Sequence, residues 1–191
     1  MERPIADCCF LCLRHGETNW NAQGRFLGRS DIPLNERGRA QATTAAHQLR
    51  ACRPHLVVSS PLIRALETAR IIADTLKVPL HVEPNLIECD FGSFEGRTIA
   101  EVMSEYNVAT KEGLAGILPA DGESWAALSQ RTLKCIRSWV KTYGEATILF
   151  VAHDAVLQAA AEQLCGTWFD NQHGKPHRFT CLGDSWTVAP I

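Results

Sequence analysis

Near the beginning of the chain stands the stretch Leu11-Cys12-Leu13-Arg14-His15-Gly16-Glu17-Thr18, in which an apolar run stops abruptly at charged residues. The run from Cys8 to Leu13 spans six residues, which favours a buried strand over a helix. Such a strand presents an arginine and a histidine at its carboxyl end, where open α/β sheets place their ligand crevice. Gly16 lets the backbone turn tightly and a ligand approach closely. A cation beside an imidazole suits phosphate chemistry; the alternative is a strand that ends in Arg-His by chance.

Length and composition indicate one soluble globular domain over residues 1–191, with 46% hydrophobic and 21% charged residues. The net charge of −2 argues against nucleic-acid binding, so local arginines must hold an anionic substrate. Every apolar run is too short for a membrane span, and the run after Met1-Glu2-Arg3-Pro4 is too short for a signal peptide. We expect a cytoplasmic protein without a membrane or nucleic-acid partner. The sequence leaves the oligomeric state open, a homodimer included.

Eight cysteines raise the alternative of disulfides or a metal site. Only Cys9 and Cys12 have C-x-x-C spacing, and no second such pair completes a zinc site. Residues three apart on a strand point to opposite faces, so these two thiols could not share a metal. Most of the cysteines stand in apolar surroundings, where free cysteine behaves as a small hydrophobic residue. We therefore expect reduced thiols in an intracellular protein and no metal.

Strands and helices are predicted to alternate along the chain. The predicted strands are 8–13, 56–58, 80–82, 147–152, 178–182 and 186–188, and the predicted helices are 36–49, 61–76, 98–106, 124–141 and 154–165. Helix caps are expected at Asn35, Ser60, Thr98 and Asp154, with Gly166 as a stop. This alternation predicts an α/β fold of three layers, α/β/α, with a mostly parallel central sheet.

Candidate functional residues stand at the ends of these elements. Arg14 and His15 end the first strand, Arg64 opens the helix after the second, Glu88 lies in the loop after the third, and His153 ends the fourth. If the strands are parallel, all of these residues converge on one edge of the sheet.

These residue types fit covalent phosphoryl transfer. A neutral His15 would attack phosphorus in line, while Arg14 and Arg64 supply planar charged forks for the phosphate oxygens. His153 would add a donor as an imidazolium held by the bound phosphate. Glu88 would protonate the leaving alkoxide and then take a proton from water. No metal is needed, because the arginines supply the positive charge.

The ordered set of motifs resembles the histidine phosphatase superfamily, the phosphoglycerate mutase-like proteins. The matching segments are Arg14-His15-Gly16, Asn19-Trp20-Asn21, Arg25-Phe26-Leu27-Gly28, Asp31-Ile32-Pro33-Leu34, Ser59 to Ala65 with Thr68-Ala69, Glu88 to Gly96, Gly122-Glu123-Ser124 with Arg131, and Phe150-Val151-Ala152-His153. The resemblance covers nearly the whole chain. It implies a phosphoglycerate mutase-like fold, a phosphohistidine on His15 and a proton donor in Glu88. It also implies a substrate pocket bordered by Asn21 and the backbone near Leu27 and Gly28.

Asp154 departs from the family pattern, because small members usually have glycine after the second histidine. In the acid phosphatase branch of the family, a His-Asp pair supplies the proton donor through the aspartate. The stretch from Cys89 to Gly96 instead resembles small phosphatases, including α-ribazole phosphatases and broad-specificity enzymes. We interpret Asp154 as a helix N-cap that borders the phosphate site, close enough to perturb His153.

The leading hypothesis is a metal-independent phosphomonoesterase, without cofactor, that hydrolyses a small phosphorylated metabolite. The alternatives are a phosphoglycerate mutase-type phosphotransferase and a non-catalytic phospholigand-binding protein on the same fold. The intact set of candidate residues argues against the second alternative. The 38 positions after His153 (191 − 153) leave little room for the long tail of a mutase.

For several other residues, the sequence predicts only an approximate position. His173 and His177 lie in a loop that could border the pocket, and selectivity is expected in the segments 106–121 and 167–178. The tryptophans are expected in the core rather than as a platform for a sugar or a base, although Trp20 lies beside the active loop.

Overall fold

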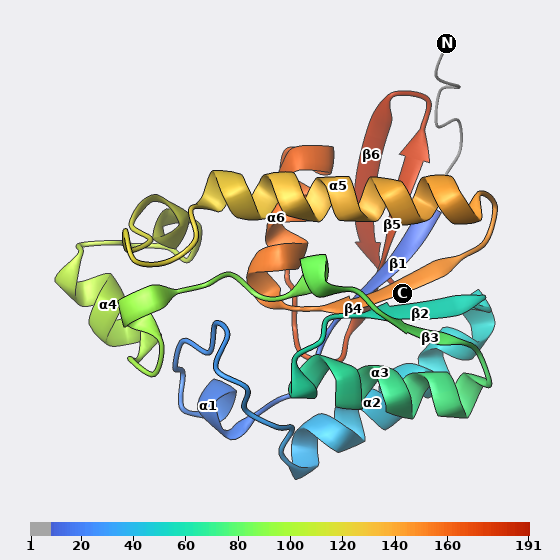
Figure 1. Cartoon of the computed structure of the whole chain (residues 1–191), viewed down its shortest axis with the longest axis horizontal. Coiled ribbons are helices and arrows are strands. Elements are labelled where there is room, and N and C mark those ends of the chain that lie inside the picture. The colour runs from blue at the N-terminus through green and yellow to red at the C-terminus, as the bar shows by residue number, and fades with distance from the viewer. Residues whose placement is uncertain (1–8) are drawn as a thin grey trace.

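A six-stranded sheet with the order β3-β2-β4-β1-β5-β6 forms the centre of the protein (Figure 1). The computed structural model describes residues 9–191, so Cys8, predicted to start the first strand, lies outside the described residues. The strands are β1 (Cys9–Arg14), β2 (Leu56–Ser59), β3 (Leu80–Val82), β4 (Ile148–Ala152), β5 (Pro176–Leu182) and β6 (Ser185–Pro190). Strands β1 to β4 pair in parallel, whereas β5 runs antiparallel to β1 and β6 antiparallel to β5. The predicted mostly parallel sheet is confirmed.

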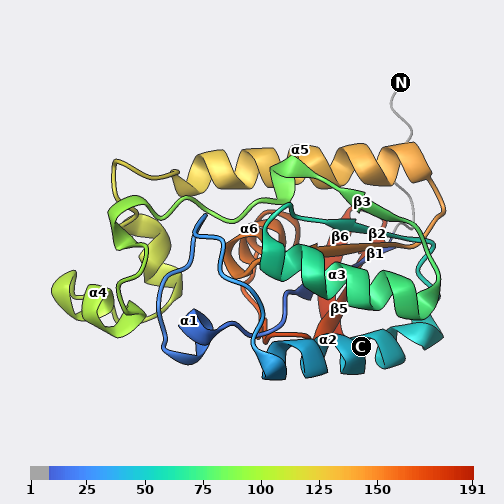
Figure 2. The same ribbon diagram turned by 60° about the horizontal axis from the view of Figure 1, so that its bottom comes forward.

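Helices cover both faces of the sheet, as predicted (Figures 1 and 2). The helices are α1 (Asn19–Ala22), α2 (Glu36–Leu49), α3 (Ile63–Leu76), α4 (Ile99–Glu105), α5 (Trp125–Tyr143) and α6 (Asp154–Cys165). Helices α2 and α3 pack on one face and α5 and α6 on the other, while α1 and α4 lie to one side of these layers. The short helix α1 stands inside the segment 18–34, which the sequence predicted as loop.

Alternating side chains of the buried strands fill two separate cores. In β1, Phe10 and Cys12 point towards α5 and α6, whereas Leu11 and Leu13 point towards α2 and α3. All four side chains have no exposed surface. Because successive residues of a strand point to opposite faces, an unbroken apolar run is what a strand covered on both faces requires.

Local sequence signals explain most helix ends. The Asn35 side chain accepts a hydrogen bond of 2.8 Å from the backbone N–H of Gly38 and so caps α2. Thr98 and Glu101 form the predicted capping box of α4. Gly166 ends α6 with φ +67°, in the left-handed region that glycine favours.

Two predicted caps are wrong. Helix α3 begins at Ile63 with Leu62 as its N-cap. The hydroxyl of Ser60 accepts a hydrogen bond of 3.3 Å from the backbone N–H of Leu62 and also contacts the imidazole of His153. Helix α6 has His153 as its N-cap, so Asp154 is the first helical residue and its carboxylate is left to other partners.

The carboxyl ends of the parallel strands meet at one edge of the sheet. The backbone N–H of His15 donates to the carbonyl of Ala152 at 3.0 Å, and that of Ser60 donates to the carbonyl of Val151 at 3.1 Å. These bonds continue the pairing of β1 and β2 with β4 one step beyond the strands. The residues that follow all three strands are therefore neighbours.

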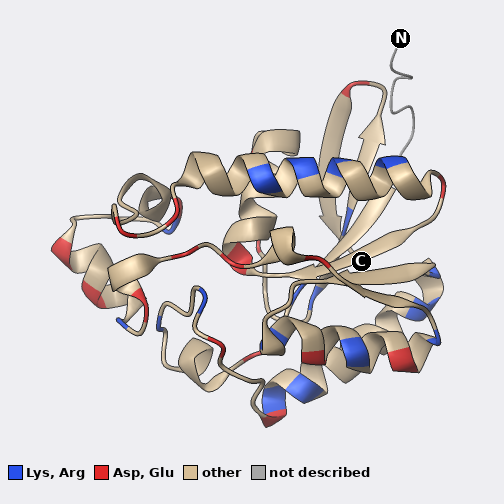
Figure 3. Cartoon of the chain, viewed as in Figure 1, with Lys and Arg blue, Asp and Glu red and all other residues tan. Residues whose placement is uncertain are grey.

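Charged residues are distributed unevenly over the helices (Figure 3). Helix α5 carries only basic charged residues, α4 and α6 carry only acidic ones, and α2 and α3 carry both signs. Among residues 9–191, no helix is long and apolar enough to cross a membrane.

Candidate active site

A cavity of about 560 Å³ opens at the edge where the parallel strands end. Its lining includes eight of the nine residues that the sequence predicted for the site, namely Arg14, His15, Asn21, Leu27, Gly28, Arg64, Glu88 and Asp154. The ninth, His153, is fully buried, and its ring centroid lies 5.2 Å from that of His15. The fold thus brings together residues that are up to 140 positions apart (154 − 14).

His15 is held in a single tautomer by its two neighbours. Its Nδ1 lies 2.7 Å from the carbonyl oxygen of Gly16, which can only accept, so Nδ1 carries the proton and donates. Its Nε2 accepts a hydrogen bond of 3.2 Å from Nε of Arg64 and so holds a lone pair. Burial first, and then the positive charge of Arg64, lower the pKa of His15 well below its usual value. The imidazole is therefore neutral, with its lone pair on Nε2.

Arg64 is fixed by the backbone of the loop that precedes α2. Its two terminal nitrogens donate to the carbonyl oxygens of Gly28 at 2.6 Å and of Ser30 at 2.8 Å. The side chain has no exposed surface, and burial lowers its pKa to about 10. The guanidinium hence keeps its charge at neutral pH, beside the nucleophile.

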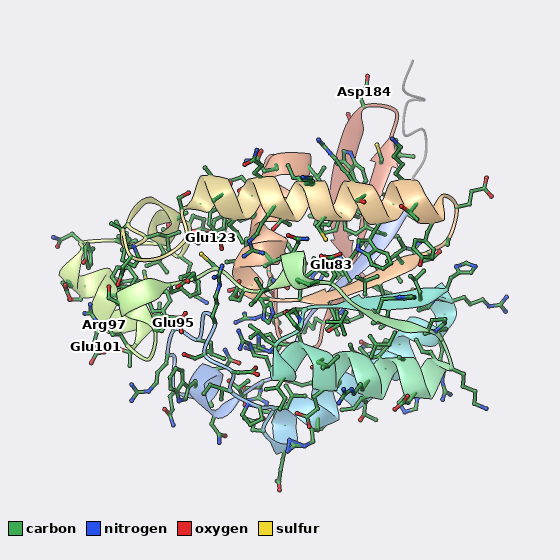
Figure 4. All side chains as sticks on the ribbon, in the orientation of Figure 1. Glu83, Glu95, Arg97, Glu101, Glu123 and Asp184 are labelled. Atoms are coloured by element: carbon green, nitrogen blue, oxygen red, sulfur yellow. The ribbon has the colours of Figure 1, made fainter. Side chains whose placement is uncertain are left out.

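Glu95 fixes the loop whose carbonyl oxygens accept hydrogen bonds from Arg64. Its carboxylate accepts hydrogen bonds from the backbone N–H groups of Arg29 at 2.8 Å and Ser30 at 3.0 Å, and from the Ser30 hydroxyl at 2.6 Å (Figure 4 labels Glu95). Gly28 has φ +53°, and a Cβ there would collide with the Glu95 carboxylate. The left-handed backbone therefore favours glycine at this position of the predicted motif, and the close approach of Glu95 adds to that preference.

Arg14 reaches the cavity from the end of β1. Its Nη1 donates to the carbonyl oxygen of Asn171 at 3.2 Å and lies 3.4 Å from the Asp154 carboxylate. The Asn171 amide also donates to Asp154 at 3.1 Å. The buried Nε of Arg14 has no partner among the described residues, so the guanidinium keeps a donor for an anion. Asp154, predicted as a cap, instead orients Arg14 together with Asn171.

His153 lies behind the nucleophile with one nitrogen free. Its Nε2 is 2.6 Å from the hydroxyl of Ser60, whereas its buried Nδ1 has no partner among residues 9–191. Burial first, and then Arg64, lower its pKa well below the usual value. An imidazolium at this place therefore requires the negative charge of a phosphate.

Glu88 borders the cavity with only 5% of its surface exposed. Its carboxylate accepts a hydrogen bond of 2.9 Å from the backbone N–H of Cys89. Burial outweighs this bond and raises the pKa of Glu88 to about 6. A carboxyl with this pKa exchanges its proton near neutral pH, as a general acid and base must.

Arg131 fixes the loop that carries Glu88. Its guanidinium pairs with the Glu123 carboxylate at 2.7 and 2.8 Å and donates to the carbonyl oxygens of Asn85 at 2.7 Å and Glu88 at 3.1 Å. Glu123, labelled in Figure 4, also lies 3.7 Å from Arg29. The sequence motif that contains Glu123 and Arg131 thus has a positioning role.

Sequence reasoning left His173 as a loop residue near the pocket, and the structure places it against the nucleophile. Its ring centroid lies 5.3 Å from that of His15, and its Nδ1 donates to the His15 carbonyl oxygen at 3.0 Å. Burial, together with Arg14, lowers its pKa to about 3. His177, by contrast, is absent from the cavity lining and packs edge-on against Phe169.

Gly16 has a different role from the one predicted. A Cβ on Gly16 would collide with the carbonyl of Gly38, and a Cβ on Gly38 with that of Glu17. The close approach that requires Gly16 is therefore to the first turn of α2. This packing fixes the turn that presents His15.

The expectation that the tryptophans belong to the core holds for Trp125, which packs against the core but also lines the cavity, and is wrong for Trp168. Trp125, at the start of α5, and Trp168, after α6, are half-buried and line the cavity. Their rings stack with centroids 5.2 Å apart. No sequence signal links them, because 43 positions separate them (168 − 125).

Among the described residues, Cys9, Cys12, Cys52, Cys89, Cys135 and Cys165 are free thiols. Cys9 is exposed and Cys12 buried, which confirms that they occupy opposite faces of β1. Within residues 9–191, no group of three or more His, Cys, Asp or Glu side chains is arranged to hold a metal ion.

Comparison with known proteins agrees with this geometry. The model of the histidine phosphatase superfamily (branch 1) matches residues 10–183. The chain is 33% identical over 157 residues to the "Uncharacterized phosphatase PhoE" of Bacillus subtilis (strain 168), covering 82% of this chain and 77% of that protein. It is 32% identical over 157 residues to the "Probable phosphoglycerate mutase GpmB" of Enterobacter sp. (strain 638), covering 81% and 73%. The crystal structure of the alpha-ribazole phosphatase from Shigella flexneri superposes with a TM-score of 0.79 at 28% identity, covering 96% of each chain. The chain therefore belongs to the histidine phosphatase superfamily, as an enzyme of its branch 1.

Proposed function

We propose that the chain is a phosphomonoesterase that transfers the phosphoryl group of a small phosphate ester first to His15 and then to water. The observation that carries this proposal is the lone pair on Nε2 of His15, fixed between Gly16 and Arg64. Arg14 and Arg64 surround this atom with positive charge, and Glu88 borders the same cavity with a pKa of about 6. A nucleophile, an anion site and an acid thus meet in one place.

The first step forms a bond between phosphorus and Nε2 of His15 and breaks the bond between phosphorus and the alcohol oxygen. Arg64 and Arg14 stabilise the charge on the equatorial oxygens. The ester binds as its monoanion and passes that proton to the free Nδ1 of His153, which then donates to the phosphoryl group. Glu88 gives its proton to the leaving alkoxide.

The second step returns the enzyme to its starting state. The ionised Glu88 removes a proton from water, the water oxygen bonds to phosphorus, and the bond to Nε2 breaks. Inorganic phosphate leaves, and Glu88 is protonated again. His153 returns its proton to the departing phosphate, so both protons are accounted for without a cofactor, and no metal is required because the arginines carry the positive charge.

The proposal is tested by trapping the intermediate. Rapid acid-free quenching during turnover of a phosphate ester labelled at phosphorus should leave label on His15, in an acid-labile, alkali-stable linkage. The His15→Ala protein should carry no label and lose turnover; full turnover by that protein would overturn the proposal. Exhaustive dialysis against a chelator should leave the activity of the native protein in place.

A small phosphorylated metabolite is the partner that the size of the cavity supports, at about 560 Å³ within the range of small-molecule sites. A non-catalytic phospholigand-binding protein would need the arginines but not an acid of raised pKa. Glu88 is the observation that favours an enzyme.

A further inference from the structure

We propose that the stacked pair Trp125 and Trp168, which we call the aromatic wall, binds a flat aromatic ring in the alcohol portion of the substrate. The inference rests on the proposed phosphomonoesterase activity and adds a substrate class to it. Both side chains line the same cavity as His15. The phosphoryl site and the aromatic wall thus recognise the two ends of one ester.

A single carboxylate holds the two indoles in place. Nε1 of Trp125 donates to Oε2 of Glu162 at 2.6 Å, and Nε1 of Trp168 donates to Oε1 of the same side chain at 3.4 Å. The two rings lie 16° from parallel. Three segments of the chain, the start of α5, the body of α6 and the segment after α6, therefore hold the wall before any substrate arrives. Prearranged rings lose little freedom when they bind a ligand.

The aromatic wall offers ring surface rather than hydrogen bonds. Both indole N–H groups are committed to Glu162. The amide of Gln158, which also lines the cavity, is committed to the backbone of Phe169 through both of its polar atoms, at 2.9 and 3.2 Å. The amide of Gln172 donates to Asp170 at 2.6 Å.

Because these polar groups are already hydrogen-bonded within the protein, the aromatic wall is better suited to bind an aromatic ring than a sugar. A sugar ring stacked on tryptophan needs free donors and acceptors for its hydroxyl groups, because each unpaired hydroxyl that leaves water is penalised. A flat ring needs only the faces and edges of other rings, with which it stacks or makes edge-on contacts. The aromatic wall satisfies the second requirement, whereas donors and acceptors for a sugar would have to come from other parts of the lining, such as Lys111, Glu112 and Asp170.

The test compares esters whose leaving groups are all primary alkoxides, so that protonation by Glu88 contributes equally. The probes are propyl phosphate, 3-phenylpropyl phosphate, 3-cyclohexylpropyl phosphate and glucose 6-phosphate. We expect kcat/KM for the phenyl ester to exceed that for each of the other three by roughly tenfold, the selectivity that one good aromatic contact supplies. A cyclohexyl ester that reacts as well as the phenyl ester, or a preferred glucose 6-phosphate, would overturn the proposal.

Substitutions of single tryptophans test whether the selectivity for the phenyl ester arises from the aromatic wall. Trp168→Leu should reduce the ratio of kcat/KM for the phenyl ester to that for propyl phosphate by roughly tenfold, and Trp125→Leu should do the same. Trp139→Leu is the matched control. Trp139 is also an indole of α5 that donates to a glutamate, Glu83, at 2.9 Å and stacks on Tyr143, but it is absent from the cavity lining. An equal reduction in all three variants, or none in the first two, would show that the wall does not bind the ring.

Binding without turnover separates this inference from the proposed function. Calorimetry on the His15→Ala protein should show tighter binding of 3-phenylpropyl phosphate than of propyl phosphate, and Trp168→Leu in that background should remove the difference. Equal binding of the two esters would refute the aromatic wall while labelling of His15 in the native protein still upholds the phosphatase. Absence of any label on His15 would refute the phosphatase.

Discussion

Nε of Arg64 donates a 3.2 Å hydrogen bond to Nε2 of His15, the atom that the proposed mechanism uses as its nucleophile. The same guanidinium donates to the carbonyl oxygens of Gly28 and Ser30, so the nucleophile is oriented by a loop that lies elsewhere in the sequence. When the lone pair bonds to phosphorus, the Nε–H of Arg64 is already beside the equatorial oxygens. One side chain thus serves the imidazole before the reaction and the phosphoryl group during it.

We expect Arg64→Lys to lower kcat/KM by about 10²–10³-fold, because an ammonium cannot reproduce the three-way fork. Steady-state kinetics with a simple alkyl phosphate measure the loss. The matched control is Arg70→Lys, since Arg70 is exposed on the same helix. Similar losses in both variants would show that the geometry of Arg64 has no special role.

Glu88, rather than Asp154, is expected to protonate the leaving group, because Asp154 is engaged with Arg14 and Asn171. Glu88→Gln should therefore slow alkyl phosphates far more than nitrophenyl phosphate, whose leaving group needs little protonation. Rates for a series of esters with leaving groups of different pKa supply the comparison. The assignment is reversed if Asp154→Asn shows this dependence and Glu88→Gln does not.

The raised pKa of Glu88 also predicts how stability depends on pH. Folding raises this pKa from 4.5 to about 6, so the native protein holds the proton more tightly than the unfolded chain. The free energy of unfolding then falls as the pH rises from about 4.5 to about 6, by about 2 kcal/mol, and stays lower above that range. The glutamine of the Glu88→Gln variant cannot ionise, so the free energy of unfolding of that variant should not fall in this way. Urea unfolding of both proteins at about pH 4 and about pH 8 should show the variant gaining relative stability at the higher pH; an equal difference at both would contradict the prediction.

The sequence predicted the elements and the residues that meet at the cavity better than it predicted local contacts. Arg14 and His15 can be identified from the sequence because a strand buried on both faces must be apolar, so the first charged residues mark its end. Ser60 and Asp154 were predicted as caps because both types commonly cap helices. Each also contacts a side chain more than ten positions away, His153 and Asn171 respectively, which no local pattern reveals.

The aromatic wall, and the contact of His173 with His15, were missed for a related reason. Trp125 and Trp168 approach each other only because α5 and α6 pack on the same face of the sheet. His173 meets His15 because Gly174 donates to the carbonyl of Arg14, which docks the segment after α6 against the end of β1. Such contacts follow from the assembled fold and not from spacing.

His173 is expected to act as a positioning residue through its bond to the His15 carbonyl oxygen. His173→Ala should lower kcat by about tenfold with little change in KM, since one neutral hydrogen bond is lost. His173→Asn should restore most of the rate, because the asparagine amide can donate from nearly the position of Nδ1. The exposed His47 provides the control. A purely structural role would instead lower the melting temperature and leave His173→Asn no better than His173→Ala.

Water is expected to be the normal phosphoryl acceptor, although similar proteins carry both phosphatase and mutase names. A mutase must protect its phosphohistidine from water while an intermediate reorients. The cavity here is also lined by Lys111, Glu112 and Gln172, which are exposed, so its mouth is open to solvent beside His15. Inorganic phosphate should therefore appear at the same rate as the dephosphorylated alcohol. The decisive measurement uses 3-phosphoglycerate with a trace of 2,3-bisphosphoglycerate: conversion to 2-phosphoglycerate faster than phosphate release from any ester would identify a mutase instead.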